Sequence, residues 1–121
     1  MTTRTASVTG RRPVDQAFPG ESSLITWADL QNGDDGEAVQ FGAFTDRSIQ
    51  FGGTFGTGGT IVLEGSNDGV SYHPLTDPQG NPISKTTASI EAISEATRYV
   101  RPRVTAGDGT TSLAAYLFLR G

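Results

Sequence analysis

The sequence predicts an all-β protein, an antiparallel β-sandwich of jelly-roll type with an extended N-terminal arm. Short apolar segments recur along most of the chain, and turn signals rich in Gly, Pro, Asn and Asp separate them. The 121 residues include 16 glycines and 6 prolines, which is typical of turn-rich β proteins. We therefore expect an arm at residues 1–21 and one sandwich domain at residues 22–121.

The predicted arm is rich in Thr, Arg, Pro and Gly and shows no sustained periodicity, and its substantial apolar side chains are Val14, Ala17 and Phe18. Residues 1–20 hold three arginines and one acidic residue, whereas the rest of the chain holds six basic and twelve acidic residues. The arm is either a solvated tail or a segment that orders by docking on an acidic partner.

Composition excludes several function classes. The formal net charge is −4, and an acidic body argues against general nucleic-acid binding. The chain has no cysteine, so disulfides cannot support the core. It also lacks an apolar run of about 18 residues and an N-terminal apolar signal segment, so we expect neither membrane spanning nor export.

The first strand is predicted at Ser22 to Leu30, where apolar and polar residues alternate and Trp27 belongs to the core. The following segment, 31–36, contains Asn-Gly and Asp-Gly turn signals. Together with Asp29 and Glu37 it forms an acidic loop that either binds calcium or is a plain turn. Its spacing differs from the EF-hand pattern, which favours the plain turn.

Further strands are predicted from the same alternation and are separated by turns with identifiable chemistry. A hairpin around the turn at Ser66 to Gly69 is the clearest of these, because Asn, Asp and Gly tolerate positive φ. The segment 88–96 is either a helical turn or a bent strand. The other expected strands cover Glu37 to Phe44, Ser48 to Phe51, Ile61 to Leu63, Val70 to Tyr72 and Ile83 to Thr87, and a double turn covers Asp77 to Pro82.

A second hairpin is predicted near the C-terminal end, with strands at 99–104 and 112–119 joined by the turn at Gly107 to Gly109. The last strand is apolar on both faces, so it is either central and covered on two sides or exposes one face to another subunit. Pro102 lies in the partner strand, and its missing N–H implies a bulge or an edge position.

Catalysis is poorly supported, and we expect neither enzyme activity nor a cofactor. His73 is the single histidine, and the glycine-rich segment 52–59 lacks the Gly-Lys-Ser/Thr of a phosphate-binding loop. Arg98, Arg101 and Arg103 lie around Tyr99 and are either a solvated sheet face or a docking surface. The acidic body favours a protein partner over nucleic acid.

Longer segments of this sequence resemble two known groups of proteins. The segment 61–75, with its SNDG turn, and the later segment 98–104 resemble discoidin-like and galactose-binding-like sandwiches. Over its full length the chain resembles the capsid decoration, or cement, proteins of tailed bacteriophages. The residues behind this resemblance are the IQFGGTFGTGGTIVLEGSNDG run, the DPQGN turn and the RYVRPRVTAGDGTTSL ending.

The second resemblance implies a structural protein, made in the bacterial cytoplasm, that binds the outer surface of the capsid. Its partners would be the major capsid protein and further copies of itself, as a homodimer or homotrimer. The expected partner-binding residues are Arg4, Arg11, Arg12, Phe18, Arg101 and Arg103, with Tyr116 and Phe118 in an oligomer interface. The alternative is a discoidin-like carbohydrate-binding module of a phage virion or tail, with ligand loops at Asp34, Asp35, Asn67, Asp68 and Tyr72.

Overall fold

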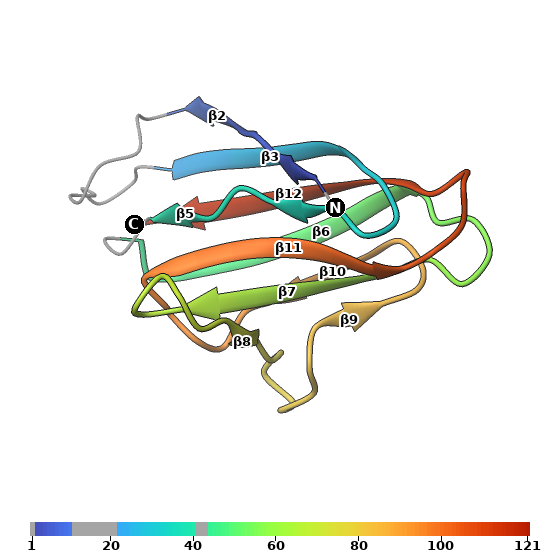
Figure 1. Ribbon diagram of the computed structural model, residues 1–121. Coiled ribbons are helices and arrows are strands. Elements are labelled where there is room, and N and C mark those ends of the chain that lie inside the picture. Colours follow the sequence, from blue (N-terminus) through green and yellow to red (C-terminus); the bar gives the residue numbers. More distant parts are fainter. Residues whose placement is uncertain (1, 11–21, 41–43) are drawn as a thin grey trace.

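The computed structural model describes residues 2–10, 22–40 and 44–121, and within them the chain is all-β. Two sheets pack face to face (Figure 1), which confirms the predicted sandwich. The strands are β1 (Thr3–Arg4), β2 (Ala6–Gly10), β3 (Ser22–Leu30), β4 (Asp35–Gly36), β5 (Val39–Gln40), β6 (Asp46–Thr54), β7 (Thr60–Ser66), β8 (His73–Pro74), β9 (Ser84–Lys85), β10 (Ser89–Ala92), β11 (Tyr99–Ala106) and β12 (Ser112–Arg120).

Strand order divides the described chain into two layers. Sheet A has the order β1-β4-β11-β7-β8, with β5 also paired to β11 and β9 to β7. Sheet B has the order β10-β6-β12-β3-β2. Neighbouring strands are antiparallel except β1 and β4, which run parallel. The two layers place their apolar faces toward each other, as the alternation in the sequence predicts.

The core lies between the sheets and is built from alternate residues of the long strands. Trp27 is fully buried, as predicted, and its Nε1 donates a hydrogen bond to the carbonyl oxygen of Glu37 at 2.9 Å. This bond satisfies the one polar atom of a large buried ring. The fully buried large side chains are Trp27, Phe44, Phe51, Ile25, Leu30, Ile49, Ile61, Leu63, Ile83, Leu113, Leu117 and Leu119.

The N-terminal segment contributes a strand to each sheet. β1 pairs with β4 in sheet A, β2 pairs with β3 in sheet B, and Thr5 alone separates the two strands. The described part of the predicted arm therefore lies along one side of the sandwich. Arg11, Arg12 and Phe18 lie outside the described residues.

The prediction of a C-terminal hairpin is wrong, because β11 and β12 belong to different sheets. The connection at 107–111 crosses from sheet A to sheet B, where Thr111 Oγ1 donates to the Phe55 carbonyl oxygen at 2.8 Å. Both strands carry an apolar row that must face the core, and a crossing connection lets the two rows face each other. β12 is central in sheet B, between β6 and β3.

The structure also tests three local predictions, at segments 70–72 and 88–96 and at Pro102. Val70 to Tyr72 is loop rather than strand, and the chain returns to pair with β7 only at β8. The segment 88–96 contains a strand, β10, and no helical turn. Pro102 lies in an inner strand instead of at an edge, opposite the break between β4 and β5.

Gly36 provides a direct test of the packing between the sheets. A Cβ atom at this position would lie 2.6 Å from Cδ of Pro102 and 2.7 Å from Cδ1 of Trp27. We expect Gly36→Ala to lower the free energy of unfolding by about 1–3 kcal/mol, because the close-packed contact leaves no room for a methyl group. Gly109→Ala is the matched control, since nothing lies within 4 Å of that Cβ. Equal urea midpoints for the two variants would contradict this packing.

Candidate functional site

The acidic turn between β3 and β4 holds the N-terminal segment. Asp34 accepts hydrogen bonds from the backbone N–H groups of Gln31 at 2.9 Å and Thr2 at 3.2 Å, and from Arg4 Nε at 2.9 Å. Burial acts to raise the pKa of Asp34, but the hydrogen bond from Gln31 and the bond and charge of Arg4 outweigh it, so the pKa is lowered. Arg4 and Asp34, both predicted as binding residues, therefore bind each other.

The neighbouring carboxylates bond the same segment. Asp35 accepts a 2.6 Å hydrogen bond from Thr3 Oγ1, and Glu37 accepts one from the Ala6 N–H at 3.0 Å. In the part of the chain that the structure describes, no group of three or more His, Cys, Asp or Glu side chains could hold a metal ion. The carboxylates of this turn therefore bond to groups of their own chain.

A network of ion pairs covers the outer face of sheet A. Glu64 of β7 lies between two arginines of β11, with Oε1 at 3.1 Å from Arg101 Nε and Oε2 at 3.0 Å from Arg103 NH2. Arg101 also lies 3.6 Å from Asp35 and stacks on the ring of Tyr72, 3.8 Å from the centroid. The side chain of Glu64 is only 7% exposed, so removing the arginines would leave a buried carboxylate without ion-pair partners. Arg101 and Arg103 thus have structural partners within the chain.

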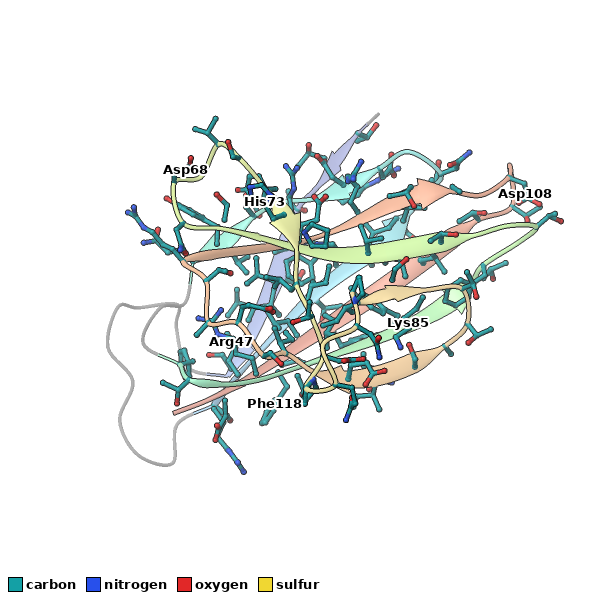
Figure 2. The ribbon with its side chains drawn as sticks, turned by 90° about the horizontal axis from the view of Figure 1, so that it is seen from below. Arg47, Asp68, His73, Lys85, Asp108 and Phe118 are labelled. Atoms are coloured by element: carbon teal, nitrogen blue, oxygen red, sulfur yellow. The ribbon has the colours of Figure 1, made fainter. Side chains whose placement is uncertain are left out.

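The loop between β7 and β8 is organised by Asp68. Its Oδ1 accepts hydrogen bonds from the N–H groups of Val70 and Ser71 and from Ser66 Oγ, and these bonds lower its pKa to about 2. Asn67 Oδ1 accepts from the Arg98 N–H at 3.0 Å. The predicted ligand groups of this loop are therefore engaged by their own chain. Figure 2 shows Asp68 and His73 together at this side of the sandwich.

The outer face of sheet B differs, because its centre is apolar and uncharged. The strand registers place side chains in rows that cross the sheet. Tyr116 is 36% exposed, Phe118 is 43% exposed and Ile90 is 64% exposed. We call this surface the Phe118 face. Its two central rows are Ala92, Ser48, Phe118 and Leu24, and Ile90, Gln50, Tyr116, Thr26 and Ser7.

A shallow hollow of about 420 Å³ lies on the Phe118 face. Ser48 of β6 has a small side chain and pairs with Phe118 on one side and with Ala92 on the other. The hollow forms there because Ser48 and Ala92 are both small and lie beside the larger ring of Phe118. Figure 2 shows Phe118 on the opposite side of the sandwich from His73. The lining also includes Thr45, Asp46, Arg47, Ile93 and Arg120.

The structure brings together only some of the predicted site residues. Tyr116 and Phe118, predicted as interface residues, lie in adjacent rows on one exposed face. Sequence reasoning missed that Ile90 and Leu24 belong to the same face. The alternation within a strand shows which residues of that strand share a face, but it does not show which residues of other strands lie on the same face. The pairing of β10 and β3 with the central strands is not encoded in any local pattern.

Comparison with known proteins gives a match in fold. A scan against protein-family models and a search of curated proteins find no match. The SPBc2 prophage-derived protein YomS has a TM-score of 0.65 at 12% identity, with 88% of this chain and 100% of that chain covered. At this identity the match shows a shared fold.

Two other matching structures are weaker. The cysteine peptidase peruvianin-I of Thevetia peruviana has a TM-score of 0.46 at 15% identity, and the alignment covers 96% of this chain and 61% of that one. IMPa of Pseudomonas aeruginosa, solved with an O-glycopeptide, has a TM-score of 0.46 at 8% identity, with 88% of this chain and 13% of that one covered. These scores are too low to bear on function.

The ion pairs of Glu64 predict a loss of stability when its charge is removed. We expect Glu64→Gln to lower the free energy of unfolding by about 1–3 kcal/mol, because two arginines then lose their charged acceptor. Urea unfolding measures the change. Arg98→Gln, at an exposed position next to β11, is the control and should change stability by less than about 0.5 kcal/mol. A Glu64→Gln variant as stable as the control would show that the network contributes nothing.

The lowered pKa of Asp68 predicts a dependence of stability on pH. The folded-state pKa of about 2 lies below the ordinary value of 3.8. The stabilisation is therefore fully present above about pH 4 and is lost as the pH falls toward 2. Urea midpoints measured between pH 5 and pH 2 should fall less steeply for Asp68→Asn than for the wild type. Parallel profiles would contradict the assigned hydrogen bonds.

Proposed function

We propose that this chain is a structural protein of a phage virion that binds the outside of the capsid as a decoration protein. The observation that carries the proposal is the fold match to a prophage-derived protein, which extends over the whole of that protein. The decoration-protein resemblance of the sequence agrees with this origin. A role in binding rather than in chemistry suits a sandwich in which Asp34, Asp35 and Glu64 each form an ion pair with an arginine of their own chain.

The arrangement of the described surfaces supports binding through extended contacts. Asp34, Asp35, Asn67 and Asp68 use their oxygens within the chain, and Tyr72 stacks on Arg101. A carbohydrate ligand would have to compete with these internal bonds, which disfavours the discoidin-like alternative. Decoration of a capsid needs many small contacts, whose repetition over the lattice supplies avidity.

We place the capsid contact at the segment 11–21, which joins β2 to β3. Gly10 and Ser22, the described residues at either end of it, both pair at the end of sheet B where β12 finishes. Arg11 and Arg12 give this segment a positive charge suited to an acidic lattice surface. Removing residues 1–20 would not test this contact alone, because β1 and β2 would be lost with them.

The test is to follow the chain on virions of the phage that encodes it. Wild-type protein should sediment with purified virions, and Arg11→Glu with Arg12→Glu should reduce the retained amount about tenfold, because repulsion replaces attraction. Val70→Glu, which adds an acidic residue at an 82% exposed site on the β7–β8 loop, is the control. Full retention of the double variant would refute the role of the segment. Absence of the wild-type chain from virions would refute the proposed function.

A further inference from the structure

We propose that the Phe118 face is the contact between two copies of this chain, related by a two-fold axis that runs along the strands between β6 and β12. Each Phe118 then sits on Ser48 of the other copy. The inference goes beyond the proposed virion role and does not depend on it. Its basis is that the face is complementary to itself in shape, charge and size.

Shape is the first argument. Phe118 projects from β12, and the hollow lies beside it over Ser48 of β6, about 4.8 Å away across one strand spacing. A rotation of 180° about an axis between these two strands exchanges their positions on opposing faces. The projecting ring of each copy therefore meets the hollow of the other. The same rotation places Leu24 on Ala92, which extends the apolar contact along the row.

Charge is the second argument. Asp46 and Arg120 pair across the same two strands at the end of the face, with oxygen and nitrogen 3.1 Å apart and both side chains 63% exposed. The proposed axis places Arg120 of each copy opposite Asp46 of the other. The same two-fold rotation thus places opposite charges together and places Phe118 in the hollow of the other copy. An isologous interface requires this reciprocity, in which residue i meets residue j and j meets i.

The interior of the face is favourable for association because its two central rows carry no charged side chain. The chain has a formal net charge of −4, so two copies repel each other over most surfaces. The two central rows of the Phe118 face add no like-charge contact to this repulsion. The second central row places Tyr116 of one copy over Gln50 of the other, where the phenol has a polar neighbour.

Size is the third argument. The strands of sheet B hold 4, 9, 9, 9 and 5 residues, which at about 3.3 Å per residue and about 4.8 Å per strand give a face of roughly 570 Å² in projection. Side-chain relief raises the accessible area above the projected one. A standard interface uses about 800 Å² of accessible surface per partner, and a specific interface needs at least about 500 Å² per partner. The face is therefore large enough for a dimer.

The first experiment measures the oligomeric state of the purified full-length chain by sedimentation equilibrium. We expect a dimer for the wild type. Phe118→Arg should raise the dimer dissociation constant at least about 30-fold, because a charge replaces the central ring. Val70→Arg, on the β7–β8 loop and 82% exposed, is the matched control and should remain dimeric. Circular dichroism and urea unfolding confirm that each variant is folded.

The second experiment tests the axis itself by mixing two charge variants. Arg120→Asp gives each copy an acidic residue at both position 46 and position 120. Asp46→Arg gives each copy a basic residue at both positions. Each variant should be monomeric by itself, because like charges meet across the axis. Mixed in equal amounts, the two should form a heterodimer, because every acidic residue then meets a basic one. The broken ion pair within each copy is not restored by mixing.

Every outcome decides the proposal. A wild-type dimer that Phe118→Arg dissociates, together with a heterodimer from the mixed variants, supports it. A wild-type monomer at high concentration, a trimer, or a dimer insensitive to Phe118→Arg overturns it. A monomer that still sediments with virions would overturn the dimer and leave the proposed virion role standing. A dimer that is absent from virions would support the dimer and overturn the proposed virion role.

Discussion

The packing of Trp27 against Gly36 and Pro102 is the constraint on which the rest of the structure depends. Trp27 belongs to sheet B, whereas Gly36 and Pro102 belong to sheet A, so this contact sets how the layers meet. The absence of a side chain at Gly36 lets β4 lie directly against the indole. That position brings the acidic turn to the edge of the sandwich. Asp34 can then bind Arg4, which fixes the N-terminal segment across both layers.

The strands could be predicted from local sequence patterns. The sheet to which each strand belongs could not. The alternating burial from Ser22 to Ala28 and the buried Trp27 follow from the residue pattern alone. Two amphipathic strands joined by a short connection, however, have the same sequence pattern whether they form a hairpin in one sheet or lie in two different sheets. The C-terminal pair took the second form, because sandwich cores need inward rows on both sides. The predicted interface residues Tyr116 and Phe118 lie on one face, because they are two positions apart in a strand.

The two outer faces divide the chemistry of the molecule between them. On sheet A, Glu64 and its arginines form ion pairs that stabilise the fold, so charges that looked available in the sequence are already matched. On sheet B, apolar side chains remain exposed around Phe118. This division agrees with the binding role that we propose.

The place of β12 in sheet B has a consequence for biosynthesis. It is the last of the described strands to leave the ribosome, yet it separates β6 from β3 in the finished sheet. Nascent chains that stop before it hold a β10-β6 pair and a β3-β2 pair with no strand to join them. The central strand of sheet B and the Phe118 face are therefore completed together, when β12 inserts between β6 and β3.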